Sequence, residues 1–192
     1  MTKGRLEAFS DGVIAILITI MVLELKVPHG ADAGALHGML PAFLAYVLSF
    51  IYLGIYWVNH HHMLQMAERI NGGILWANLH LLFWLSLFPS ATAWLGENHR
   101  EVLPTAVYGA VMLAAAIAYY ILQGAIIAED GPGSRLATAI GNDLKGKLSP
   151  LLYVSAIGLA FVDPWISDAI YVLVAVIWLV PDPRIERHLR HG

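Results

Sequence analysis

The sequence predicts an all-α membrane protein with six transmembrane helices in each subunit. Three observations lead to this fold class. The chain is 58% hydrophobic, and only 13% of it is charged, against about 25% in soluble domains. Its apolar residues fall into six long runs, and basic residues gather on alternate connections between those runs. No soluble domain fits between the runs, so we expect the protein to act within the bilayer and residues 1–192 to form a single transmembrane domain.

The composition also excludes several classes of function. The net charge of −3 argues against a nucleic-acid partner. The chain contains no cysteine, which rules out disulfides, thiolate metal sites and cysteine nucleophiles. No serine–histidine–acid arrangement or phosphate-binding loop stands in a suitable context. We therefore expect no enzyme activity, no cofactor and no resident metal.

The first predicted helix, residues 6–25, organises the rest of the chain. Its apolar run, residues 13–23, is broken only by Thr19 and is shorter than the roughly 20 residues that cross a bilayer. The helix must therefore include polar first turns that hold Ser10 and Asp11. A carboxylate facing lipid costs a few kcal/mol or more, so it faces protein or water instead. This reasoning predicts a central helix.

The later helices follow from apolar runs and the breaks between them. We expect them at about residues 39–63, 74–95, 102–128, 148–162 and 165–180. The pair Gly72-Gly73 separates the second run from the third, and Asp163-Pro164 closes a hairpin between the last two. Apolar residues recur every four positions in 134–148, which predicts an amphipathic helix at the membrane interface or an extension of the next helix.

The distribution of basic residues sets the predicted orientation. Six helices place both termini on one side. Nine Lys and Arg residues fall on that side, namely Lys3, Arg5, Arg69, Arg135, Lys145, Lys147, Arg184, Arg187 and Arg190. Lys26 and Arg100 fall on the other. The positive-inside rule then makes both termini cytoplasmic. A cleaved secretory signal ending near residues 31–33 is the alternative, but acidic residues flank its apolar run unfavourably.

One face of the first helix carries a candidate pore lining. Ile16, Ile20 and Leu23 follow the i, i+4, i+7 spacing of a single helix face, with Thr19 at its edge. Copies of this helix around an axis would stack apolar rings, and such rings gate ions by dewetting. The alternative is an ordinary packing surface, which is what most apolar stripes are. Because no internal repeat is visible, a pathway on a symmetry axis requires oligomerisation.

Polar residues elsewhere offer competing interpretations. The run His60-His61-His62 lacks the i, i+4 spacing of a two-histidine metal site and suits the membrane interface better. In the third predicted helix, Asn78 and His80 are expected to face the bundle, as hydrogen-bonding groups or as a proton relay. A proton- or ion-coupled transporter that uses Asp11, Glu24 and His80 is therefore a second functional hypothesis. A structural membrane protein without transport is a third.

The first helix and four later fragments resemble one known family. Arg5, Phe9, Ser10 and Asp11, followed by the apolar stripe, are similar to the signature first helix of the transmembrane protein 175 family. That family contains the lysosomal potassium channel of animals and shorter bacterial relatives. The supporting fragments are residues 56–61, Asn78 with Phe88-Pro89, residues 148–153 and residues 161–165.

The resemblance implies a homotetramer in the inner membrane of a bacterium, with the first helix lining the pore. It implies passive conduction of monovalent cations with some preference for potassium as the permeant ion. In this family there is no Thr-Val-Gly-Tyr-Gly filter, and the sequence has none. Ile16 matches the narrowest ring, Ile20 and Leu23 the rings above it, and Thr19 a layer linked to selectivity.

The resemblance also implies roles for the polar residues of the first helix. Arg5, Phe9, Ser10 and Asp11 match the motif that holds this helix against its neighbours. The implied partners are Trp57, His60 and Asn78.

Overall fold

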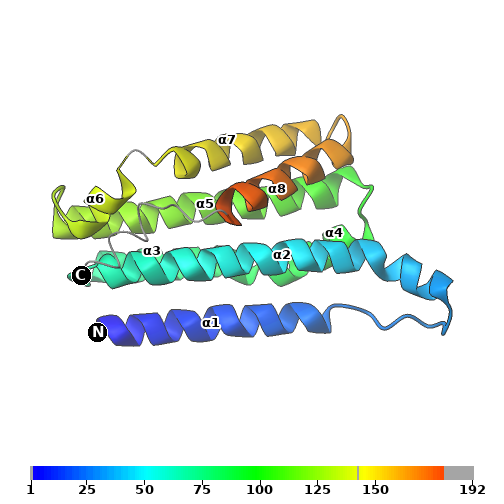
Figure 1. The fold of residues 1–192 in the computed structure, drawn as a ribbon, viewed down its shortest axis with the longest axis horizontal. Helices are drawn as coiled ribbons and strands as arrows, with labels where there is room; N and C mark the ends of the chain where they lie inside the picture. The colour runs from blue at the N-terminus through cyan, green and yellow to red at the C-terminus, as the bar shows by residue number, and fades with distance from the viewer. Residues whose placement is uncertain (1, 142, 180–192) are drawn as a thin grey trace.

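The computed structural model describes residues 2–141 and 143–179, which fold into helices running along one long axis (Figure 1). The helices are α1 Lys3–Leu23, α2 Ala33–Met66, α3 Gly72–Ser86, α4 Phe88–Glu97, α5 Val102–Asp130, α6 Arg135–Ile140, α7 Leu144–Leu159 and α8 Pro164–Leu179. The start of α1, the α2–α3 loop and the end of α5 lie at the same end of the bundle (Figure 1).

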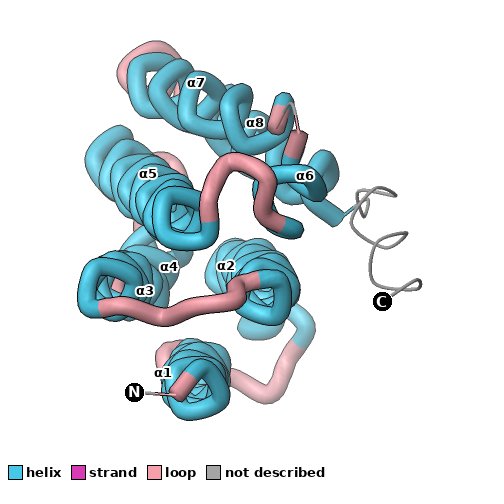
Figure 2. Tube along the Cα trace, turned by 90° about the vertical axis from the view of Figure 1, so that its left-hand side faces the viewer, coloured by secondary structure: helices cyan, strands magenta, loops and turns pink. Residues whose placement is uncertain are grey.

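The bundle is layered when it is viewed from its end (Figure 2). Helix α1 lies at one edge, where it contacts α2, α3 and α4. Helix α2 and the α3–α4 pair form the next layer, and α5, α7 and α8 form the far side. The first helix therefore sits at the margin of the single subunit, so its predicted central place needs further copies of the chain.

The third predicted helix, residues 74–95, is divided in the structure. Helix α3 ends at Ser86 and α4 begins at Phe88, with Leu87 as the shared cap. Pro89 lies in the first turn of α4. Proline has no backbone N–H to donate to the preceding turn, and its ring clashes with the carbonyl four residues earlier. The prediction of one unbroken helix was wrong at this point, although α3 and α4 together still form one apolar stretch, Gly72–Glu97.

The predicted amphipathic helix at 134–148 is divided as well. Gly141 adopts a positive φ of 51° after α6, a conformation that glycine reaches without steric cost. Asp143 then caps α7 by accepting a hydrogen bond from the Gly146 backbone N–H at 2.8 Å. The last residues of the stretch thus extend α7, as one of the two predicted alternatives required. Residue 180 and the basic residues beyond it lie outside the described part of the chain.

The second helix begins earlier than the predicted residue 39. The Asp32 carboxylate accepts a hydrogen bond from the Ala35 backbone N–H at 2.8 Å. This N-cap satisfies an amide at the start of α2. The helix runs through Pro41 to Met66. The backbone carbonyls at its carboxyl end bind Lys3 of α1.

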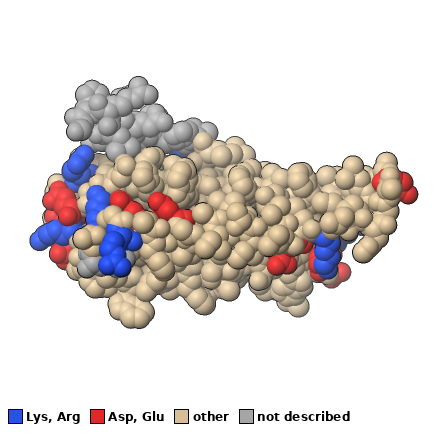
Figure 3. All heavy atoms as spheres, turned by 90° about the horizontal axis from the view of Figure 1, so that it is seen from below, with Lys and Arg blue, Asp and Glu red and all other residues tan. Residues whose placement is uncertain are grey.

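The outer surface fits a membrane environment. Helices α1, α2 and α5 and the α3–α4 stretch are long and apolar enough to cross a bilayer. Helices α7 and α8 have 16 residues each. On the face that Figure 3 shows, charged side chains gather toward the two ends, and the surface between them is uncharged. Large apolar side chains such as Trp76, which is 75% exposed, point outward. These features define a multi-pass membrane protein.

Buried tyrosines tie α2, α5 and α8 into a firm body. The Tyr52 hydroxyl donates to the Tyr171 carbonyl at 2.5 Å, and the Tyr171 hydroxyl donates to the Thr105 carbonyl at 3.0 Å. Gly109 lies beside this second hydroxyl, and a Cβ at residue 109 would overlap the Tyr171 oxygen. Glycine is therefore required at this close approach between α5 and α8, which belong to the body against which α1 packs.

Candidate functional site

Helix α1 has two clearly different faces. Its buried side chains are Leu6, Ser10, Ile14, Leu17 and Met21, which recur every three or four residues. This stripe packs α1 against the rest of the subunit. The opposite side is open.

The predicted pore stripe lies on the open side. Ile16 is 58% exposed, Ile20 39% and Leu23 80%. Thr19 is also exposed, and its hydroxyl donates to the Ile16 carbonyl on the same helix at 2.8 Å. The stripe therefore does not pack against the rest of the described subunit. The alternative interpretation, an ordinary packing surface, required that it should. A bilayer or another copy of the chain must cover it.

Val22 does not follow the burial expected from helical spacing alone. Val22 belongs with Ile14 and Ile18 to the side opposite the stripe by helical spacing. It is nevertheless 46% exposed, whereas Ile14 is fully buried. Met21, in the same turn, is only 2% exposed, so Val22 lies outside the buried stripe of α1.

Three buried polar groups join α1 to α2 and α3. The Asn78 amide nitrogen donates to Ser10 Oγ at 3.0 Å, and Ser10 Oγ donates to the Leu6 carbonyl at 2.9 Å. His60 Nε2 lies 2.7 Å from Asn78 Oδ1. Because the Asn78 nitrogen faces Ser10, its oxygen must accept from His60, which places the imidazole hydrogen on Nε2. Ser10 and Asn78 are fully buried, and His60 is 1% exposed.

A second contact lies beside this chain of hydrogen bonds. The Trp57 indole N–H donates to an Asp11 carboxylate oxygen at 2.9 Å. The His61 ring stacks on the same indole, with ring centroids 6.3 Å apart. Ser10, Asp11, Trp57, His60 and Asn78 thus meet at one place, and both contacts fix the rotation of α1 about its own axis.

The other two residues of the first-helix motif are not part of this cluster. Phe9 is 49% exposed. Arg5 is exposed, and its guanidinium group makes no hydrogen bond or ion pair within the described part of the chain. Neither side chain attaches α1 to another helix of the described subunit, so any anchoring role must involve a neighbouring copy or lipid headgroups.

The residues of the transporter hypothesis do not converge. His80 was expected to face the bundle, but it is exposed and accepts a hydrogen bond from Trp84 of its own helix at 3.0 Å. That expectation was wrong, because the side chain two positions from buried Asn78 points to a different side of α3. Glu24 is exposed at the end of α1, about 20 Å from Asp11 along the helix at 1.5 Å per residue.

The histidine run does not assemble a metal site in the described part of the chain, where three or more His, Cys, Asp or Glu residues gather nowhere in metal-binding geometry. His60 binds Asn78, and His61 lies 2.9 Å from the Gln65 amide nitrogen. Consecutive helical residues point in different directions, so His60 turns to Asn78, whereas the centroids of the His61 and His62 rings lie 6.0 Å apart.

At the far end of α1, an ion pair crosses to α4. Lys26 Nζ lies 2.5 Å from a Glu97 carboxylate oxygen. The hydrogen bond and the negative charge of Glu97 raise the pKa of the Lys26 amine. Since both side chains are well exposed, the pair contributes little to stability.

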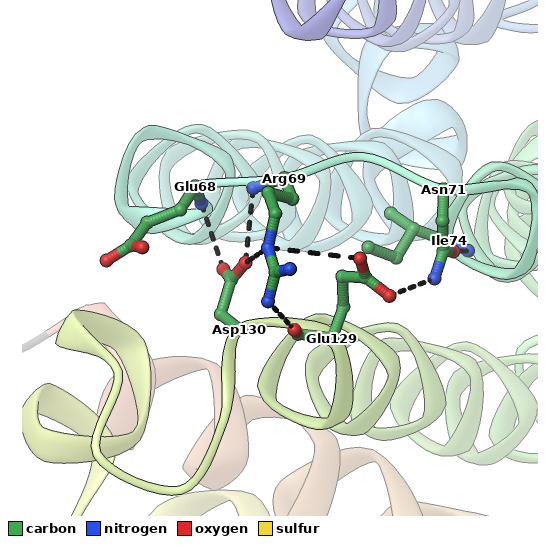
Figure 4. Close-up of polar contacts among 6 residues, drawn as sticks. All are labelled: Glu68, Arg69, Asn71, Ile74, Glu129 and Asp130. Atoms are coloured by element: carbon green, nitrogen blue, oxygen red, sulfur yellow. Dashed lines mark hydrogen bonds and ion pairs between the residues drawn. The ribbon is translucent and has the colours of Figure 1, made fainter.

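A further polar cluster, which no sequence pattern predicts, lies at the opposite end of the bundle (Figure 4). The Asp130 carboxylate accepts from the backbone N–H groups of Glu68 and Arg69, at 2.9 and 3.1 Å. Asn71 donates to a Glu129 carboxylate oxygen at 2.6 Å. These contacts hold the α2–α3 loop on the end of α5. In the sequence, Asp130 directly before Gly131 is typical of an ordinary helix end. Its binding of the α2–α3 loop is evident only in the folded structure.

The fold and this site define a class of protein. It is a multi-pass helical membrane protein with a marginal first helix that is rotationally fixed by buried polar contacts and bears an uncovered apolar face. The family described as "Endosomal/lysosomal potassium channel TMEM175" matches residues 5–89. That segment contains the polar cluster around Ser10 and Asn78.

Relatives match along the whole chain. A potassium channel of Chryseobacterium sp. (strain P1-3) is 56% identical over 192 residues and covers 100% of both chains. A potassium channel of Streptomyces collinus is 37% identical and covers 96% of each chain. The crystal structure of a lysosomal potassium-selective channel TMEM175 homologue from Chamaesiphon minutus superposes with a TM-score of 0.83 at 30% identity. It covers 93% of this chain and 96% of that one.

The chain belongs to the TMEM175 family. The family and these relatives are ion channels, not enzymes. The human endosomal/lysosomal proton channel TMEM175 is 39% identical over 118 residues, and the match covers 54% of this chain and 23% of the human one. The resemblance inferred from the first helix is therefore confirmed at the level of the family.

Proposed function

We propose that this protein is a potassium-permeable cation channel in which four copies surround a pore lined by α1. The observation that carries the proposal is the open face of α1, where Ile16, Ile20 and Leu23 are uncovered while the opposite face packs. The bacterial relatives are named potassium channels and match the full length of the chain, which favours a pore over a lipid-facing stripe.

Permeation in this proposal is passive. Apolar side chains from symmetry-related copies of α1 form rings, and an ion crosses such a ring only when water wets it. Ile16 forms the narrowest ring, Ile20 and Leu23 the rings beyond it, and Thr19 adds hydroxyl groups to the wall. Potassium and other monovalent cations are the permeant ions, and no cofactor takes part.

The orientation follows from charge. Lys3, Arg5, Arg69 and Arg135 lie at the end where α1 begins, whereas Lys26 lies at the other. We place the first end in the cytoplasm of a bacterial cell by the positive-inside rule, with both termini there and six spans in one domain. Helices α7 and α8 complete the six as a shorter hairpin, which tilt or local bilayer thinning accommodates.

The test of this function is the reversal potential of purified protein in a planar bilayer. Under a potassium gradient alone, a passive channel reverses close to the potassium equilibrium potential and does not follow an imposed pH gradient. A coupled transporter would show saturable flux tied to pH instead. Absence of any potassium current from well-folded protein would contradict the proposal.

A further inference from the structure

Lys3 makes a contact that its position in the sequence does not reveal. Its ammonium nitrogen donates to the Gln65 carbonyl at 2.7 Å and to the Ala67 carbonyl at 3.0 Å. Both carbonyls lie at the carboxyl end of α2, where the last turn of a helix leaves oxygens without helical partners. A cation there is also favoured by the partial negative charge of the helix end.

The carbonyls that Lys3 binds belong to a segment that is itself fixed. Ala67 directly precedes Glu68 and Arg69, whose backbone N–H groups are held by Asp130 (Figure 4). The Asp130 side chain is fully buried although it lies at a helix end, and Arg69 Nε is 3.8 Å from its carboxylate.

Glu129 reinforces the same segment from the end of α5. Arg69 donates to the Glu129 carbonyl, and the Asn71 amide binds the Glu129 carboxylate while its oxygen caps α3 at the Ile74 N–H. The first turn of α1 is therefore connected through the α2–α3 loop to α5, the helix that leads into the tyrosine-linked body.

We propose that Lys3 is a positioning residue for the pore helix, acting through the α2–α3 loop that Asp130 holds. This inference rests on the proposed function, because it assumes that α1 lines the pore. The Ser10 and Asp11 contacts fix α1 about two turns further along, and Lys3 fixes its first turn. With both in place the helix can neither rotate nor tilt, so the Ile16 ring stays at a defined radius.

The test compares five single variants, two at Lys3, two at Asp130 and one control. Lys3→Met removes the donor, and Lys3→Arg keeps the charge and the donors. Asp130→Ala releases the loop without touching α1, and Asp130→Asn, which keeps one acceptor, serves as its milder form should the alanine variant fold poorly. Arg135→Met is the matched control, since it removes an exposed cation from α6 at the same end of the molecule.

Two readouts follow each variant. The first is the mobility of a spin label at Gly4→Cys, a position where an added Cβ meets no atom within 4 Å and where no native cysteine interferes. The second is the potassium-to-sodium permeability ratio of the reconstituted channel.

We expect Lys3→Met to shift the first turn of α1 toward its released state about tenfold, which corresponds to about 1.4 kcal/mol. The permeability ratio should change with it. Asp130→Ala or its asparagine form should change both readouts in the same direction. A double variant should add little, because both residues act on one contact. Lys3→Arg and Arg135→Met should behave like the unmodified protein.

Three results would overturn the proposal. Unchanged label mobility in Lys3→Met would show that the contact does not hold the helix. Greater mobility with an unchanged permeability ratio would show a local cap without influence on the pore. An equal effect of Arg135→Met would show that only surface charge matters. In all three cases the unmodified channel still conducts, which separates them from failure of the proposed function.

Discussion

Asn78 is the residue on which the attachment of α1 most depends. Its amide uses the nitrogen toward Ser10 and the oxygen toward His60, at 3.0 and 2.7 Å. No other side-chain type of this size supplies both a donor and an acceptor in this arrangement. Ser10 and His60 belong to α1 and α2, so one buried amide joins three helices.

Replacing this amide should destabilise the protein measurably. Asn78→Ala leaves the Ser10 hydroxyl oxygen and the His60 N–H buried without partners, and interhelical polar contacts of this kind are worth about 1–2 kcal/mol in membranes. The matched control is Asn59→Ala, because the Asn59 amide donates to the Ile55 carbonyl of its own helix at 2.8 Å. Thermal unfolding in detergent should show a clearly larger loss for Asn78→Ala. Equal losses would mean that the three-helix contact contributes nothing special.

At the scale of the helix, α1 combines a packed face with an open apolar one. Ile14 is fully buried and Ile16 is 58% exposed, two residues apart on the same turn. If the open face surrounds an ion path, its chemistry must control conduction. If lipid covers it, its chemistry affects only membrane solvation.

Two substitutions of Ile16 should therefore have opposite effects. Ile16→Asn lets water and ions wet the constriction, so conductance should rise and cation discrimination should fall. Ile16→Phe narrows an apolar ring and should lower conductance. Single-channel recording of both variants measures the difference. A loss of current in both would point to damaged folding or a pore elsewhere.

The first helix also shows how far the sequence can be interpreted alone. Its length argument places Ser10 and Asp11 inside protein. The structure buries Ser10 fully and Asp11 partly, with the Asp11 carboxylate accepting from the Trp57 indole. The faces of short polar segments are harder to predict. His80 differs from Asn78 by two positions and lies on another side of α3, a distinction that depends on neighbouring helices.

The positions at which helices break within apolar stretches were equally difficult to predict from the sequence. Pro89 separates α3 from α4, yet Pro41 lies within an unbroken α2. Pro41 lies well inside α2 and Pro150 well inside α7, so a proline alone does not decide whether a membrane helix ends, because neighbouring groups can satisfy the backbone atoms that it frees. The Lys3 and Asp130 contacts join residues more than sixty positions apart, and no local pattern encodes them.

At the scale of the whole molecule, the proposed channel requires more than one subunit. The tyrosine-linked body, the polar anchors and the charged ends lie within one chain, but among the described residues none packs on the apolar face of α1. Cyclic assembly completes such a face by placing identical copies around an axis. The central claim is thus that α1 from several subunits forms the wall of an aqueous ion path.

The most direct measurement uses the absence of native cysteine. Single variants Ile16→Cys, Ile14→Cys and Phe83→Cys are recorded in a bilayer before and after a small cationic thiol reagent is added. Ile14 is buried, and Phe83 is 55% exposed on α3, where lipid should exclude a charged reagent. We predict rapid block of Ile16→Cys and no change in the other two. An Ile16→Cys channel that conducts and never reacts, or a block that appears only at Phe83→Cys, would contradict a pore lined by α1.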